Sequence, residues 1–155
     1  MPNKAKFNEI EAQLNSMPLS NPVNNPGTFE TKQKVQVARF VYNFAVSGGA
    51  VSNINLVGLD NAADAYLPQG ALVVGADMVV ATTCTSGGSA TIALGVNSAG
   101  DLIAAEAVAS FTSGAIVSLD TKAKASANAI PFISIAVAAL TAGKINVYIQ
   151  YIIAE

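Results

Sequence analysis

The chain has 155 residues, enough for one domain with its own hydrophobic core. Hydrophobic residues make up 52% of it and charged residues only 12%, whereas a typical soluble domain carries about 25% charged residues, so we expect other protein to cover part of its surface. The net charge of −2 is too small to indicate a nucleic acid or an anionic membrane as the main partner.

Residues 1–34 differ from the rest of the chain and are predicted to form an N-terminal arm. A short amphipathic helix is expected at its start, because four apolar residues recur at or near helical spacing: Phe7, Ile10, Leu14 and Met17. Residues 18–27 hold three prolines, which restrict φ and remove backbone donors, so they predict an extended segment. A helix this short is marginal alone. We therefore expect the four apolar side chains to bind a neighbouring subunit or a partner; the alternative is a disordered tail.

From residue 35 the hydrophobic period changes to two, which predicts β-strands. The first strand, within 34–46, has a core face made of Ala38, Phe40, Tyr42, Phe44 and Val46. Further strands are expected at 51–59, 71–83, 90–96, 102–109, 115–119, 131–137 and 144–153, with a loop at 60–70. Turns rich in Gly, Asn and Ser separate the strands, so residues 35–155 predict an all-β sandwich or barrel. An antiparallel, jelly-roll-like β-sandwich of about eight strands is the preferred architecture.

The hairpin at 90–109 is predicted to have two unlike faces. Its large face consists of Ile92, Leu94 and Val96, and its small face of Thr91, Ala93 and Gly95. The large face belongs in the core. The small face suits the close approach of another backbone or sheet, so we expect it to serve as a contact surface.

No catalytic residue, cofactor or metal site is predicted. The chain has no histidine, which removes the common catalytic triads and histidine metal sites. Its one cysteine, Cys84, cannot form an internal disulfide and is expected to be a buried small hydrophobe. Asp60, Asn61 and Asp64 form the closest acidic cluster, but their spacing matches no EF-hand and a solvated turn is expected. A carboxylate pair for glycoside hydrolysis would also need sugar-binding aromatics, and the chain has no Trp.

Neither a membrane span nor a secretory signal is expected. The longest apolar run, residues 129–143, is shorter than the roughly 18–20 residues that cross a membrane. The N-terminal residues are polar and do not resemble a signal peptide. The high hydropathy is therefore assigned to a packed core and to interfaces.

Residues 66–108 combine a Pro-x-Gly step, a Val-rich strand, a Ser/Gly turn, ATIALGV and AGDLIAA. This pattern resembles a segment that recurs in structural proteins of tailed-bacteriophage virions. The ending LTAGKINVYIQYI, residues 140–152, is similar to the closing strand of the same proteins. The family most resembled is that of the small capsid decoration, or cement, proteins and head-fibre bases. These motifs are turns and strands, so they indicate the group more than the position in the virion, and the arm lies outside the resemblance.

The resemblance implies a homotrimeric β-sandwich that is made in the host cytoplasm and sits on the outer surface of the virion capsid. Its partner there would be the major capsid protein, whose neighbouring subunits it would hold together against the pressure of the packaged DNA. No nucleic acid, membrane or cofactor is implied as a partner.

Two alternatives stay open, and an enzyme is the least favoured class. One is a tail or fibre-attachment protein built on the same sandwich. The other is a carbohydrate-binding adhesin module, for which the tyrosines available to stack on a sugar are Tyr42, Tyr66, Tyr148 and Tyr151.

Overall fold

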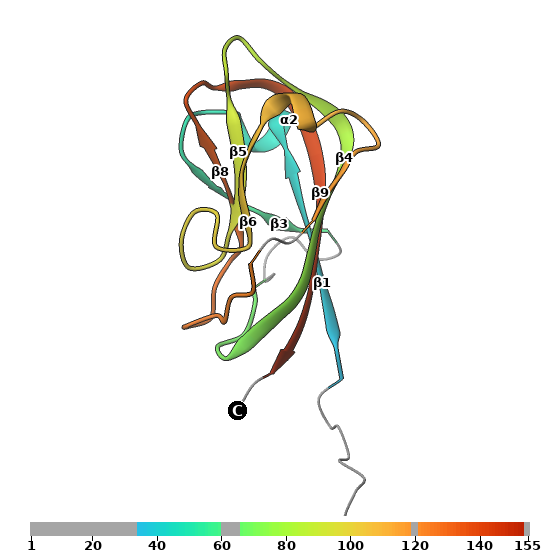
Figure 1. The fold of residues 1–155 in the computed structure, drawn as a ribbon, viewed down its shortest axis with the longest axis vertical. Helices are drawn as coiled ribbons and strands as arrows, with labels where there is room; N and C mark the ends of the chain where they lie inside the picture. The colour runs from blue at the N-terminus through green and yellow to red at the C-terminus, as the bar shows by residue number, and fades with distance from the viewer. Residues whose placement is uncertain (1–33, 60–65, 119–120, 154–155) are drawn as a thin grey trace, which may run out of the picture. The chain divides into compact units, whose positions relative to one another are not determined.

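The computed structural model describes residues 34–59, 66–118 and 121–153. They form two antiparallel β-sheets, packed face to face as a sandwich, and one short α-helix (Figure 1). The elements are β1 (Gln36–Asn43), α2 (Phe44–Ser47), β2 (Asn53–Asn55), β3 (Val57–Gly58), β4 (Ala71–Ser86), β5 (Thr91–Gly95), β6 (Ile103–Ala107), the 3₁₀ helix η1 (Val108–Ser110), β7 (Ile116–Ser118), β8 (Phe132–Ala136) and β9 (Leu140–Ile153). Sheet A has the strand order β3-β1-β9-β4-β7, and sheet B has the order β2-β8-β5-β6.

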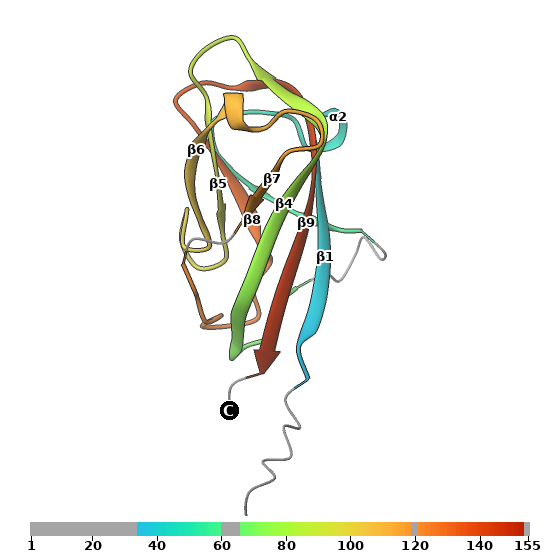
Figure 2. The ribbon, with the colours of Figure 1, turned by 45° about the vertical axis from the view of Figure 1, so that its right-hand side comes forward.

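This strand order is that of a jelly roll, which confirms the predicted architecture. Apart from the two-residue β3 at the edge of sheet A, the described strands number eight, four in each sheet. Every connection between these eight strands crosses from one sheet to the other, except the β5–β6 hairpin. Such crossing is the mark of a double-sheet jelly roll. Figure 2 shows the two layers, with β4, β9 and β1 in one and β5, β6 and β8 in the other.

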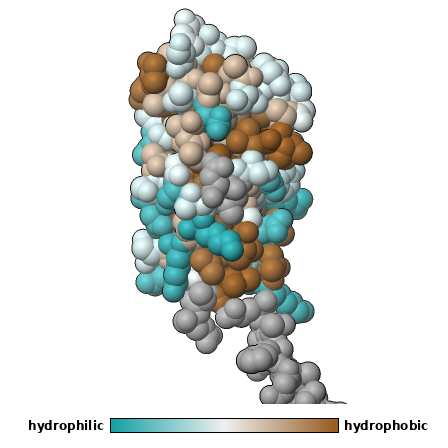
Figure 3. Space-filling view, in the orientation of Figure 1, coloured by the Kyte–Doolittle hydropathy of each residue, from teal (hydrophilic) through white to brown (hydrophobic). Residues whose placement is uncertain are grey.

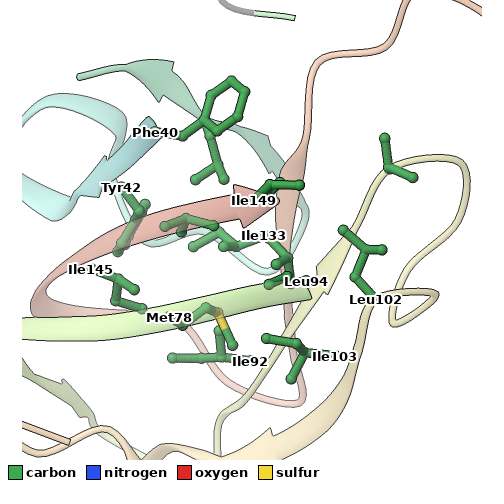
Figure 4. Close-up of a cluster of buried hydrophobic side chains, with 14 of the residues drawn as sticks. Phe40, Tyr42, Met78, Ile92, Leu94, Leu102, Ile103, Ile133, Ile145 and Ile149 are labelled. Atoms are coloured by element: carbon green, nitrogen blue, oxygen red, sulfur yellow. The ribbon is translucent and has the colours of Figure 1, made fainter. Parts of the chain in front are cut away.

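The core lies between the two sheets and is apolar throughout the described residues, where no polar or charged residue is fully buried. Alternate side chains of β9, the central strand of sheet A, fill it: Ile145, Val147 and Ile149 are completely buried. Ile92 and Leu94 face them from sheet B (Figure 4). Each such side chain contributes about 1.5–3 kcal/mol of transfer free energy on burial. The periodicity of two in 90–96 and 144–153 therefore predicted the core correctly.

The first strand is shorter than predicted, because Asn43 ends it. The Asn43 side-chain oxygen accepts a hydrogen bond from the Ala45 backbone N–H at 3.1 Å and starts the one-turn helix α2. The alternation of the strand stops there. Phe40 and Tyr42 are buried as expected, but Phe44 is only half-buried and Val46 is 77% exposed. The prediction of Val46 in the core face was therefore wrong.

The strand predicted at 51–59 is two strands in different sheets. β2 pairs with β8 in sheet B, and β3 pairs with β1 in sheet A. The chain crosses the sandwich at Leu56, which is buried and whose N–H donates to the Pro131 carbonyl at 2.9 Å. A short apolar run does not show where the chain passes from one sheet to the other. The sequence pattern therefore predicted one strand where the structure has β2 and β3.

Candidate interaction surface

Among the described residues, the two titratable side chains with clear pKa shifts lie inside the sandwich. Burial raises the pKa of the Cys84 thiol to about 11, and Cys84 is 4% exposed, as predicted. Burial, with the nearby Cys84, raises the pKa of Tyr42 to about 12. The Tyr42 hydroxyl donates to the Gly48 carbonyl at 2.7 Å and so ties β1 to the chain after α2. Both groups therefore stay protonated at neutral pH. Their buried environment is typical of structural residues and not of reactive ones.

The small face of the β5–β6 hairpin is covered by the chain itself. Ala93 is 4% exposed, and a Cβ atom on Gly95 would collide with the Ser98 carbonyl and with the Phe132 ring. The loop at 97–101 therefore packs on this face. The expected close approach of a backbone is present, but it comes from the same chain, so the predicted contact surface for another sheet was wrong at these residues.

A single carboxylate shapes that loop. Asp101 accepts hydrogen bonds from three consecutive backbone N–H groups, of Val96, Asn97 and Ser98, at 2.8, 2.9 and 3.1 Å. Three such bonds satisfy donors that no strand partner reaches. The AGD turn of the sequence thus serves to fold the loop back onto β5.

The outer face of sheet A has one row that is unusually apolar for an exposed sheet, although the rows beside it include Arg39, Asp77 and Lys144. One row of cross-strand neighbours runs over all five strands: Val57, Val41, Asn146, Val79 and Ile116. Asn146 is the single polar member, and among the described residues its Oδ1 is the buried side-chain oxygen that has no hydrogen-bond partner. The solvated face of an antiparallel sheet is normally polar. The outer face of sheet B fits that rule better, with Asn53, Asn55 and Ser134.

An open hollow of about 180 Å³ lies where this face meets α2. It is lined by Val41, Asn43, Val46, Ser47, Val57, Leu59 and Lys144. The lining is mostly apolar with one cationic side chain, which suits an apolar side chain of a protein partner. Sequence reasoning missed the hollow, because its walls depend on β3 joining the edge of sheet A beside β1.

The four tyrosines considered for sugar binding differ in their exposure and hydrogen bonding. Tyr42 is fully buried, and the half-buried Tyr151 bonds Gln36 through its hydroxyl at 2.9 Å. Tyr66, at 50% exposed, and the half-buried Tyr148 are the two left to serve a sugar. The predicted arm contacts Phe7, Ile10, Leu14 and Met17, and the loop residues Asp60, Asn61 and Asp64, lie outside the described residues.

The described part of the chain has neither a metal-binding cluster nor a membrane-spanning helix. No group of three or more acidic, Cys or His side chains is placed to hold a metal ion there. Within the same residues, none of the helices has the length and hydrophobicity required to span a bilayer.

No protein-family model matches the chain, and no curated protein matches it. Solved structures do share its fold. A chain in the capsid asymmetric unit of cyanophage Pam1 is 20% identical, with a TM-score of 0.58 over 88% of this chain and 96% of that chain. A chain in the acid-stable capsid structure of Helicobacter pylori bacteriophage KHP30 is 17% identical, with a TM-score of 0.53 over 76% and 86%. One in the capsid of Ralstonia phage GP4 is 18% identical, with a TM-score of 0.50 over 79% and 86%. The chain therefore has the fold of a chain found in each of these three phage capsid structures.

Proposed function

We propose that this protein is a structural component of a tailed-phage virion: a decoration, or cement, protein that binds the outside of the head and stabilises contacts between major capsid subunits. The observation that carries this is the match to a chain of the Pam1 capsid over 88% of this chain and 96% of that one. The two chains are therefore similar in length. The likeness therefore extends over nearly the whole of a chain of similar length.

The physical properties of the domain support a structural role. Its core is uniformly apolar, its two shifted pKa values both favour the protonated form, and its outer sheet face carries a row of four apolar residues around Asn146. Each contact with a shell would bury a modest apolar area, at about 25 cal/mol per Å². Repetition over many equivalent sites, and over the copies of a trimer, turns such weak contacts into strong attachment.

The arm is part of this proposal. Residues 1–34 carry the apolar stripe of Phe7, Ile10, Leu14 and Met17, which would bind the shell or a sister subunit. A trimer would present three arms and three domains to a local symmetry axis of the shell, so that loss of one contact would not release the protein.

Co-sedimentation tests the function directly. Purified protein is mixed with empty shells assembled from the cognate major capsid protein and pelleted at increasing input. A decoration protein saturates at a ratio to the shell subunit that the lattice determines. Failure of the folded protein to pellet at any input would rule out the decoration role and leave a tail or host-binding role.

A further inference from the structure

The described loops at one end of the sandwich, and α2 beside them, contain no charged residue. Three of the segments that meet there are 44–53 with α2, 82–91 between β4 and β5, and 134–143 between β8 and β9, and we call these three the charge-free end (Figure 1). None of them holds an Asp, Glu, Lys or Arg. In Figure 3 the half of the surface at this end is mostly white to brown, and most of the teal, hydrophilic surface lies in the other half.

The three segments are fastened to one another by short hydrogen bonds and close packing. The Leu140 N–H donates to the Gly49 carbonyl at 2.8 Å, and the Ser86 hydroxyl donates to the Ala139 carbonyl at 2.7 Å. A Cβ atom on Gly88 would lie 3.0 Å from the Ala138 Cβ. The loops therefore have little room to rearrange, and a partner would bind a surface that is already ordered.

Exposed valines project from this ordered end. Val46 is 77% exposed, Val137 is 74% exposed and Val51 is 53% exposed, and the first two exceed every other large hydrophobic side chain of the described residues. Small residues such as Ala, Gly, Ser and Thr make up most of the surface around them. An apolar patch on a rigid, uncharged surface is a feature of protein contact sites.

Val137 also has a conformation that a valine rarely adopts. Its φ is +70°, and the Ala138 N–H donates to the Ala136 carbonyl at 2.9 Å across it, which closes a tight turn. A β-branched residue is disfavoured at positive φ, where glycine would be the unstrained choice. Strain of this kind at a solvent-exposed position indicates that the side chain has a use there.

The chemistry of the charge-free end selects one class of partner. Its segments hold no cation, and the single Lys144, which follows them and lines the hollow beside Val46, is not the cluster of basic residues that binds a phosphate or an anionic lipid. The charge-free end also has no Tyr or Trp for a sugar, and its single aromatic, Phe44, is half-buried. An uncharged protein surface fits it best, because no charged group would lose hydration on contact. A second copy fits less well: a stable dimer buries about 800 Å² per partner, more than three valines on a loop end supply, whereas a shell repeats the contact many times.

Resting on the proposed function, we infer that the charge-free end is the surface by which the domain docks on the shell, against an uncharged, apolar area of the capsid protein. The described chain begins at Lys34, just before the other end of β1. Residues 18–33, which follow the predicted arm helix, can span roughly 50 Å when extended, against about 26 Å for the eight residues of β1. The arm can therefore reach the same shell surface on which this end docks.

The test adds charge to the full-length protein at two matched pairs of positions. The docking variant is Val46→Asp with Val137→Asp. The control variant is Val37→Asp with Ile130→Asp, which changes two apolar side chains that are 57% and 45% exposed and lie outside both the charge-free end and the apolar row. All four sites are surface positions, so both variants should keep the melting temperature within about 3 °C of the parent protein.

Co-sedimentation with empty shells gives the readout. The docking variant should bind roughly a hundredfold more weakly, because each carboxylate loses hydration without a partner, while the control variant binds as the parent does. If the docking variant melts early, Val46→Ser with Val137→Ser replaces it, with about a tenfold loss expected.

The outcomes separate this inference from the proposed function. If the parent protein binds and the docking variant binds equally well, or the control loses binding to the same degree, the docking surface is elsewhere and only this inference fails. If the parent protein does not bind shells, both fail. A change in the oligomeric state of the free docking variant, measured by sedimentation velocity, would assign the charge-free end to a contact between copies and overturn its assignment to the shell.

Discussion

The thiol of Cys84 lies directly against the backbone of Gly143, on the neighbouring strand of sheet A. A Cβ atom on Gly143 would lie 2.5 Å from Cys84 Sγ and 3.2 Å from Cys84 Cβ. The φ of Gly143 is +143°, which also disfavours a side chain there. The position falls in the irregular stretch of β4–β9 pairing, where the register shifts around Thr82 and Thr85. Gly143 thus lets two strands stay paired at a bulge.

Replacing Gly143 with Ala should destabilise the domain strongly. We expect the free energy of unfolding to fall by about 2–4 kcal/mol, from steric overlap and backbone strain together. Urea denaturation followed by circular dichroism measures it. Gly87→Ala is the control, because nothing lies within 4 Å of a Cβ at Gly87. Equal stability of the two variants would show that β4 and β9 can separate at this point without loss.

The pKa values of Cys84 and Tyr42 predict a loss of stability at high pH. The pKa of Cys84 is raised from 9.0 to about 11 in the folded state, so the unfolded chain loses the thiol proton first. Stability is therefore complete below pH 9 and declines as the pH rises from 9 to 11, by on the order of 2 kcal/mol. Thermal melts at pH 7 to 11 measure this decline, to which Tyr42 adds above pH 10.

The variant Cys84→Ala isolates the contribution of the thiol. Its melting temperature should be lower at pH 7, because a buried side chain is shortened, but it should fall less steeply above pH 9 than that of the parent. The folded parent should also react slowly with a thiol reagent at pH 7 and rapidly in denaturant. An equal pH slope in the two proteins would place the titrating group elsewhere.

Asp101 should be essential for the loop that covers the small face of β5. The variant Asp101→Ala leaves the N–H groups of Val96, Asn97 and Ser98 without their acceptor. We expect a loss of about 2 kcal/mol in the free energy of unfolding. Asp101→Asn keeps one acceptor oxygen and should lose about half as much. Hydrogen exchange at residues 96–98 provides a local measurement, and unchanged protection there would contradict the role assigned to the carboxylate.

The sequence pattern predicted most of the fold, because alternation reports burial directly. Ile145, Val147 and Ile149 alternate with Asn146 and Tyr148, and this strand lies at the centre of sheet A. Features that depend on the third dimension were not predictable in this way. Alternation continues through Val46 in the sequence, but the side-chain cap of Asn43 bends the chain away.

The candidate surfaces were less predictable than the fold. The charge-free end joins three segments that are distant in the sequence, and the hollow needs β3 to lie beside β1. The composition did predict that part of the surface is uncharged, because a chain with 12% charged residues has too few of them to cover the whole domain. Only the strand connections show at which end the uncharged segments gather.

The strain at Val137 predicts opposite effects on stability and on binding. Asparagine tolerates positive φ better than valine, so Val137→Asn should raise the free energy of unfolding by roughly 0.5–1 kcal/mol. Shell binding should weaken in the same variant, because an exposed apolar contact is lost. Val51→Asn, at an exposed residue without positive φ, should not be stabilised. A Val137→Asn protein that is no more stable than its parent would show that the turn at 136–138 is unstrained.

The apolar stripe of the arm can be tested without removing the arm. The triple variant Phe7→Ser, Ile10→Ser, Leu14→Ser should lower shell binding at least tenfold, and deletion of residues 1–34 should abolish it. The melting temperature of the β-domain should stay within about 3 °C in both cases. Glu9→Gln with Glu11→Gln changes polar residues between the stripe positions and serves as the matched control.

Because the arm and the charge-free end are proposed to contact one shell surface, combining the triple variant with Val46→Asp should add the two losses in binding free energy. A combined loss no larger than that of the triple variant alone would mean that the end cannot dock until the arm is bound, so that the arm provides the first attachment and the end the second.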